Sequence, residues 1–109
     1  MEGKIMKSLH HPDRKDFMLP AVLHALSDPI RLKMVAQMHN SGEQACKNFD
    51  VPIANSTRSQ HIRTLREAGI TFTRFEGTKR LLSLRTEDLN ARFPGLLDSI
   101  LKVYDKEEI

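Results

Sequence analysis

One helix, polar and basic over most of its surface, limits what this chain can fold into more than any other segment. Residues 55–68 have apolar side chains only at Ile62, Leu65 and Ala68. Gly69 follows, and glycine readily takes the left-handed backbone conformation just past a helix end. A helix with so narrow an apolar stripe leaves one broad face free to meet another molecule.

A hairpin pattern follows this helix directly. Residues 70–75 alternate apolar and polar side chains, 76–79 form a glycine-containing turn, and 80–85 return as the partner strand. Because so small a hairpin is marginal alone, it must pack on the helices. A turn over 50–54, the basic helix and a wing over about 70–85 together predict a winged helix-turn-helix.

The flanking residues supply further helices. Apolar spacing predicts helices over 16–26, 29–39 and 43–49, the second starting from an Asp28–Pro29 cap, and a last helix after Pro94–Gly95. The predicted fold is therefore mainly α with a small β-hairpin, in the order α-α-α-α-β-β-α.

The chain reads as one module. We expect residues 1–15 to form a flexible N-terminal arm and 16–106 to form a single winged helix-turn-helix domain. No apolar run approaches the roughly 18–20 residues that a membrane span needs, and the N-terminus lacks the apolar centre of a secretory signal. We expect no membrane contact and a cytoplasmic location, which also suits a single cysteine.

The net charge of +3 is unevenly distributed. Residues 55–85 carry seven basic and two acidic side chains, whereas 86–109 carry three basic and six acidic ones. A basic block on one element is typical of proteins that meet phosphates, although a charged helix face is usually just solvated. Charge by itself is therefore weak support for nucleic-acid binding.

The last predicted helix is apolar on two adjacent faces. Its apolar residues are Leu96, Leu97, Ile100, Leu101, Val103 and Tyr104. The alternatives are a helix simply buried in one domain and a subunit interface. Since the core of so short a chain is small, the pattern favours the interface.

Three blocks of sequence are characteristic in combination. They are LHALSDPIRL at 23–32, STRSQHIRTLREAG at 56–69, and FEGTK at 75–79. The first resembles the entry to the second helix, the second the recognition helix and the third the wing tip of the ArsR/SmtB family of bacterial winged-helix repressors. Each block is moderately specific, and the three in this order make a strong resemblance that covers roughly residues 16–105.

The resemblance implies a homodimer joined mainly through the first and last helices, with one recognition helix of each subunit in successive major grooves. It also implies repression of a target operon, released by a ligand or by chemical modification. The residues assigned to dimerisation are Phe17, Leu19, Val22, Leu97, Ile100, Leu101 and Tyr104.

The side chains of the basic helix also suit DNA readout independently of any family. Short polar groups lie along its first two turns, the part of a helix-turn-helix that meets base edges in the major groove. Gln60 is the best base reader because an amide pairs bidentately with adenine. Arginines on the helix could contact bases or phosphates, and the wing suits the backbone or minor groove. The predicted DNA contacts are Ser56, Thr57, Arg58, Ser59, Gln60, His61, Arg63, Arg74, Lys79 and Arg80.

Structural roles are the alternative for several of these residues. Asn55 or Ser56 is expected to cap the helix, and His61 could be packed against its neighbours. Arg58 stands where the family's pattern is usually apolar. Either its aliphatic stem lies along the edge of the core with the guanidinium outside, or the side chain adds a DNA contact.

The sequence identifies no effector. Metal-sensing relatives resemble one another in a Cys-x-Cys pair on the third helix or in Asp/His ligands on the last, whereas this chain has EQACK at 43–47 and no histidine after His61. We expect no metal site and no cofactor, since Cys46 alone cannot supply three or four zinc ligands. A redox role for Cys46, by cross-subunit disulfide or sulfenic acid, stays open, although free cysteine is commonly a small buried hydrophobe.

Catalysis is not expected. Ser59 and His61 are two residues apart on one helix, so their side chains point about 200° apart and cannot form a nucleophile–base pair. The main alternative is a winged helix that binds protein or RNA, which has no need of the basic block. We predict a sequence-specific, homodimeric repressor of a double-stranded DNA operator.

Overall fold

The computed structural model describes residues 9–107, which contain five α-helices, two short 3-10 helices and three strands. The helices are α2 (Leu19–Leu26), α3 (Pro29–Ser41), α4 (Asn55–Glu67), α5 (Thr86–Arg92) and α6 (Leu96–Glu107), with 3-10 turns η1 (Arg14–Asp16) and η2 (Cys46–Asn48). The strands are β1 (Gln44–Ala45), β2 (Thr71–Glu76) and β3 (Lys79–Leu84), in one antiparallel sheet of order β1-β3-β2. The predicted fold class, a mainly helical winged helix-turn-helix, is confirmed.

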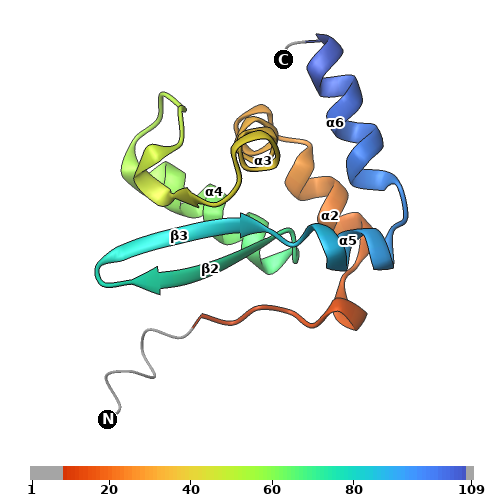
Figure 1. Ribbon diagram of the computed structural model, residues 1–109, viewed down its shortest axis with the longest axis horizontal. Helices are drawn as coiled ribbons and strands as arrows, with labels where there is room; N and C mark the ends of the chain where they lie inside the picture. The colour runs from red at the N-terminus through yellow and green to blue at the C-terminus, as the bar shows by residue number, and fades with distance from the viewer. Residues whose placement is uncertain (1–8, 108–109) are drawn as a thin grey trace.

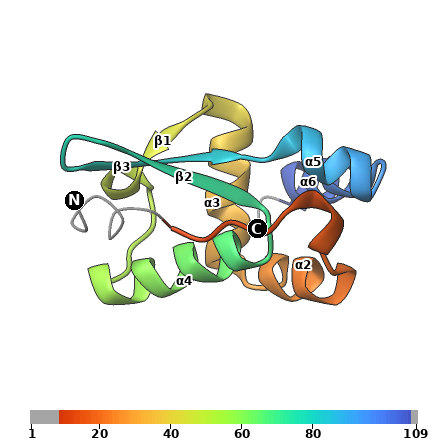
Figure 2. The ribbon, with the colours of Figure 1, turned by 90° about the horizontal axis from the view of Figure 1, so that it is seen from below.

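The hairpin and the last helix extend in different directions from a helical centre. Figure 1 shows β2 and β3 reaching across α4 on one side, whereas α6 stands at the opposite end beside α2. In the view of Figure 2, α4 lies below the hairpin and runs along it. Ile62, Leu65, Ile70 and Leu82 are almost completely buried where α4 meets the sheet. This arrangement leaves one flank of α4 and the tip of the hairpin outside.

The junction between α2 and α3 confirms the predicted cap. The Asp28 carboxylate accepts hydrogen bonds from the backbone N–H groups of Ile30 (2.8 Å) and Arg31 (3.1 Å). Burial by itself would raise the pKa of Asp28, but these hydrogen bonds lower it on balance. Pro29 begins the helix, where its missing N–H costs nothing.

The first helix begins later than predicted. It starts at Leu19 rather than residue 16, because a 3-10 turn ends at Asp16 and Phe17 is extended (φ −65°, ψ 132°). Pro20 lies in the first turn of α2, where proline is preorganised to start a helix. Because Phe17 lies outside the helix, its ring packs in the core and is only 1% exposed. The backbone carbonyl of Phe17 accepts two hydrogen bonds from Arg92.

The predicted helix over 43–49 is wrong. Gln44 and Ala45 form the edge strand β1, paired with Leu82 and Leu81 of β3, and a single 3-10 turn follows. Pairing with β3 satisfies the backbone groups of this segment in place of a helix. Phe49 is buried as its apolar character suggests.

The hairpin is confirmed, with strands shifted by one residue from the predicted bounds. Gly77, with φ +63°, supplies the left-handed residue that the tight turn requires. The buried face of β2 is the polar one: Thr71 and Thr73 are 0% and 4% exposed, whereas Phe72 is 44% exposed. Period-2 alternation determines which residues share a face but not which face is turned to the core.

A segment ahead of α2 partly covers the outer face of β2. The His11 ring stacks on Phe72 with centroids 4.4 Å apart, and its Nε2 accepts a hydrogen bond from the Thr73 backbone N–H (3.0 Å). Arg85 donates to the carbonyl oxygen of Pro12 (2.7 Å). Figures 1 and 2 both show this stretch running along the hairpin. Residues 1–8 of the expected arm lie outside the described residues, and the flexibility of 1–15 stays a prediction.

The contact of His11 predicts a pH-dependent stability. Burial, followed by the nearby positive charges of Arg66 and Arg85, lowers the pKa of His11. The unfolded chain therefore binds more protons at pH values between the lowered pKa and the ordinary one of about 6.5. We expect the free energy of unfolding to fall as pH drops below about 6.5, because a protonated Nε2 can no longer accept from Thr73.

Urea denaturation at pH 7.5 and pH 5.5 measures this effect, with His11→Gln as the control. The glutamine keeps an acceptor but does not titrate, so its loss of stability over the same interval should be smaller. An identical loss in both proteins would mean that His11 is not responsible.

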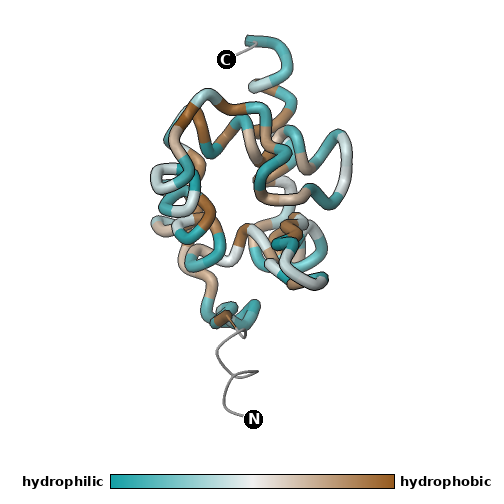
Figure 3. The backbone as a smooth tube through the Cα atoms, turned by 90° about the vertical axis from the view of Figure 1, so that its left-hand side faces the viewer, coloured by the Kyte–Doolittle hydropathy of each residue, from teal (hydrophilic) through white to brown (hydrophobic). Residues whose placement is uncertain are grey.

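The helices of the described chain are amphipathic and short. Figure 3 shows hydrophobic and hydrophilic positions alternating along the tube rather than collecting in long runs. Within residues 9–107, no helix has the length and apolar character required to cross a membrane.

Candidate nucleic-acid interface

The outer flank of α4 presents the polar side chains that the sequence singled out. Ser56, Thr57, Ser59 and Gln60 are all exposed along its first two turns, while Ile62 and Leu65 anchor the opposite side at 1% and 0% exposure. Arg63 is exposed and its guanidinium is 3.1 Å from the Glu67 carboxylate. The helix therefore offers short donors and acceptors on a rigid, core-anchored element.

The start of α4 differs from the expected cap. The N-cap position is Ala54, which has no capping side chain, and Asn55 is already the first helical residue. The predicted cap by Asn55 or Ser56 is wrong because the chain enters the helix one residue earlier. Asn55 Oδ1 instead accepts a hydrogen bond from Arg58 Nη1 (2.9 Å). Without a capping side chain, the first backbone N–H groups of α4 remain available to an anion.

His61 is held from inside the molecule. Its Nδ1 lies 3.0 Å from Arg31 Nη1, and the guanidinium also donates to the carbonyl oxygens of Ala25 (2.7 Å) and His24 (3.2 Å). Arg31 is only 8% exposed, so these contacts lie within the packed junction of α2, α3 and α4. The structure thus favours the packed alternative for His61, next to an outward-facing Gln60.

The three wing cations are not equivalent. Arg74 makes a bidentate pair with Glu43, both contacts being 2.9 Å, and that hydrogen bonding lowers the pKa of Glu43. Lys79 is exposed at the turn, and the Arg80 guanidinium lies 6.0 Å from the centroid of the Phe75 ring. Lys79 and Arg80 therefore carry the positive charge that this wing offers to a ligand.

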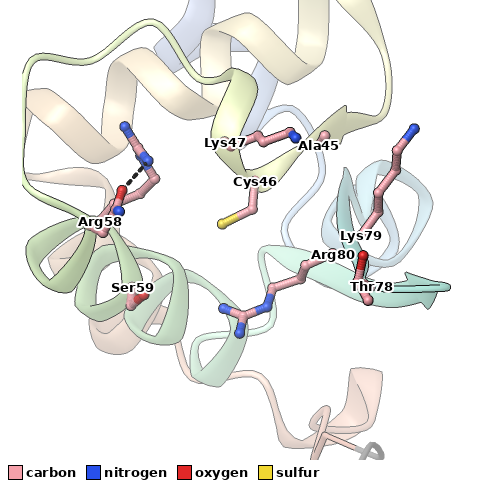
Figure 4. A pocket seen from close by; sticks show the side chains of 9 residues that line it. Ala45, Cys46, Lys47, Arg58, Ser59, Thr78, Lys79 and Arg80 are labelled. Carbon is pink, nitrogen blue, oxygen red and sulfur yellow. Dashed lines mark hydrogen bonds between the residues drawn. The ribbon is translucent and has the colours of Figure 1, made fainter.

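A cleft lies between η2, the start of α4 and β3, with a volume of about 330 Å³. Figure 4 shows Cys46 pointing into it from η2, with Arg58 and Ser59 on the helix side and Arg80 on the strand side. Lys47 lines the cleft as well, although the sequence did not suggest it. No local signal marks Lys47, since its position depends on the pairing of β1 with β3.

The setting of Cys46 bears on its chemistry. The thiol is half-buried, and burial raises its pKa despite the opposing influence of Arg80 and Arg58. A thiol with a raised pKa carries less of the nucleophilic thiolate at neutral pH. Over residues 9–107, no group of three or more His, Cys, Asp or Glu side chains is placed to hold a metal ion.

The residues assigned to dimerisation separate into two groups. Phe17, Val22, Leu97 and Leu101 are at most 5% exposed and pack in the hydrophobic core of the chain. Leu19 is 43% exposed, and Ile100 and Tyr104 are partly buried. Further exposed apolar side chains on or beside α2 and α6 are Met18, Leu23 and Val103.

Comparisons with known proteins agree with this geometry. No protein-family model matches the chain. The chain is 34% identical over 82 residues to the "Uncharacterized HTH-type transcriptional regulator YceK" of Bacillus subtilis (strain 168), an alignment that covers 72% of this chain and 82% of that protein.

Among solved structures, a "possible transcriptional regulator for arsenical resistance" is 33% identical, with a TM-score of 0.59 over 76% of this chain and 85% of that one. The transcriptional repressor BigR from Xylella fastidiosa is 27% identical, with a TM-score of 0.57 over 69% and 85% of the two chains.

Proposed function

The chain belongs to the ArsR/SmtB family of winged helix-turn-helix transcriptional regulators, and from this premise we propose that it is a homodimeric repressor of a specific operator. It is a DNA-binding regulator of transcription, a non-enzymatic class. We place its action in the cytoplasm, where the DNA of a bacterial operon is found.

The observation that carries this proposal is the exposed polar flank of α4 beside a cationic wing. Gln60 and Ser59 project from a helix whose other side is locked into the core, so a major groove could receive them without rearrangement. Lys79 and Arg80 sit on the adjacent wing, where phosphate contacts set the register. In this proposal Gln60 reads a base, and the wing supplies affinity.

The dimer is proposed from α2 and α6, which are close together in the fold. Val22 and Leu26 of α2 line the same small apolar pocket as Leu96 and Leu97 of α6. Outside this core, Leu19, Leu23 and Val103 keep 43%, 44% and 53% of their surfaces exposed. Burying these side chains against a second copy would bring two α4 helices onto one DNA duplex.

The first test is a titration of the protein into a labelled duplex from the region upstream of its own reading frame, with a scrambled duplex as control. Two salt concentrations are used for each. Tight, salt-sensitive binding to the upstream duplex at two subunits per site supports the proposal. Absence of binding to either duplex at low salt would overturn it and favour the protein-binding alternative.

Gln60→Ala tests base readout in the same assay. It should cost about 1–3 kcal/mol for the upstream duplex and little for the scrambled one, because an amide–base pair discriminates between sequences. Equal losses on both duplexes would assign Gln60 to the backbone.

The wing gives a second, independent prediction. Arg80→Gln should lower affinity for both duplexes and reduce the dependence of log K on log salt by about 1. Arg74→Gln should change that slope less, because Arg74 is already neutralised by Glu43. If Arg74→Gln had the larger effect on the slope, the Glu43 pair would have to open when DNA binds.

A further inference from the structure

The cleft between η2, α4 and β3 concentrates positive charge. Four cations line it, Lys47, Arg58, Lys79 and Arg80, together with the polar side chains of Asn55 and Ser59, and no carboxylate from residues 9–107 lines it. Its volume of about 330 Å³ is in the range of small-ligand pockets, about 300–1,000 Å³. Figure 4 shows Lys47 on η2, Arg58 and Ser59 on α4, and Lys79 and Arg80 on β3, around Cys46.

These four cations differ from four arginines elsewhere in the described chain. Arg14, Arg63, Arg74 and Arg85 each have a carboxylate within 3.1 Å. Between residues 9 and 107, no ion pair joins a carboxylate to any of the four cations of the cleft. Uncompensated like charges around one cavity attract an anion.

Arg58 gives a second, independent observation. Its Nε is buried and has no hydrogen-bond partner among the described residues, although Nη1 is occupied by Asn55. A buried donor of a charged group without an acceptor is costly, and a rotation of the Arg58 side chain toward the cleft would let an oxygen of a bound ligand accept from it.

We propose that this cleft binds a multiply charged oxyanion of the phosphate class, and that a free anion bound there opposes operator binding. The second part rests on the proposed DNA-binding function, because Arg58, Lys79 and Arg80 are also predicted DNA contacts. Two sources can supply this chemistry: a free phosphorylated small molecule, which would be an effector, or a backbone phosphate of the operator itself. Either source places a phosphate group among the same cations.

Cys46 provides a reporter, since it is the one cysteine of the chain and points into the cleft. The rate of its alkylation by iodoacetamide, a neutral reagent, is measured with inorganic pyrophosphate and with sodium chloride at equal ionic strength. Bound pyrophosphate should slow the reaction about fivefold or more, both by covering the thiol and by cancelling the positive charge that favours the thiolate. Equal rates in the two salts would overturn the proposal.

A matched pair of variants localises the effect. Lys47→Gln removes a cation of the cleft, and Lys106→Gln removes the same charge from the exposed end of α6. The pyrophosphate concentration that half-protects Cys46 should rise about threefold in Lys47→Gln and stay unchanged in Lys106→Gln. The same shift in both variants would show only a general effect of net charge and would overturn the site.

Operator titration of the same two variants identifies the source. If the ligand is a free anion, Lys47→Gln binds the operator as well as Lys106→Gln does, but loses sensitivity to pyrophosphate. If the ligand is a DNA phosphate, Lys47→Gln binds the operator more weakly than Lys106→Gln, with a smaller salt dependence. Protection of Cys46 without any competition against the operator would overturn the coupling of the cleft to DNA.

The anion site and the proposed DNA-binding function can be disproved independently of each other. Alkylation of Cys46 needs no DNA, so its outcome stands even if the chain binds no operator. Conversely, an operator complex that forms while pyrophosphate leaves Cys46 unprotected would keep the proposed function and remove the anion site.

Discussion

Replacing Gly69 with alanine is expected to lower the free energy of unfolding by about 2–5 kcal/mol, because two costs coincide at this position. Gly69 has φ +89°, where a side chain costs roughly 1–2 kcal/mol. A Cβ atom there would also meet the Phe17 ring, with Cε1, Cδ1 and Cζ all closer than 3.0 Å. Overpacking of a core typically costs about 1–3 kcal/mol.

The Phe17 ring has little freedom to move away. It is 1% exposed, and the Arg85 guanidinium lies 4.9 Å from its centroid. Gly69 itself joins the end of α4 to β2, and its N–H donates to the carbonyl of Arg66 (3.0 Å). A shift of the backbone at Gly69 would therefore displace the wing relative to the recognition helix.

Gly95→Ala is the matched control for this prediction. Gly95 has φ +81°, and a Cβ there meets no atom within 4 Å, so only the backbone cost of roughly 1–2 kcal/mol should appear. Chemical denaturation of both variants separates the two terms. Phe17→Leu in the Gly69→Ala background should recover part of the loss, and equal destabilisation of the two glycine variants would exclude the contact with Phe17.

Arg31→Met is expected to produce the second large effect, on both stability and DNA binding. The guanidinium joins two carbonyls at the end of α2 to His61 of the recognition helix, and methionine fills similar space without any donor. The buried Ala25 carbonyl and His61 Nδ1 lose their donor, whereas the His24 carbonyl keeps its hydrogen bonds from Ser27, so the loss of stability should be about 1–3 kcal/mol. Operator affinity should fall on the order of tenfold, about 1.4 kcal/mol, since α4 loses a link that orients it.

Lys33→Met on the same helix controls for the loss of a positive charge and for the introduction of a methionine side chain. Lys33 is half-exposed, and its pairing with Asp50 is loose, at 4.0 Å, so we expect little change in either measurement. Combining Arg31→Met with His61→Ala tests the route to DNA. If Arg31 acts on DNA through His61, the operator affinity of the double variant should be close to that of the more affected single variant, whereas additive losses would assign the two residues independent roles.

Several expectations from the sequence were correct because the signals are local. Asp28 ahead of Pro29 predicted a cap and a helix start, and both are present. The apolar stripe of Ile62 and Leu65 predicted which side of α4 is buried. Each of these depends on side chains within about one helical turn of each other.

One whole element was predicted wrongly because its structure depends on a remote partner. Residues 43–49 were predicted as a helix, but β3 recruits Gln44 and Ala45 as an edge strand. The pair of Arg74 with Glu43, 31 positions away, was not expected either, and the assignment of Arg74 to DNA stays a prediction. Helical periodicity over seven residues and a basic side chain in a wing do not carry this information.

By itself, the sequence determined the family, the order of the recognition helix and wing, the turn at Gly77 and the polar flank of α4. The tertiary structure decided which polar side chains are already hydrogen-bonded within the molecule. His61 is bound to Arg31 over 30 positions, and His11 to Thr73 over 62. Local periodicity and turn chemistry follow from neighbouring residues, whereas the partner of a charged or hydrogen-bonding side chain is chosen only when distant elements pack together.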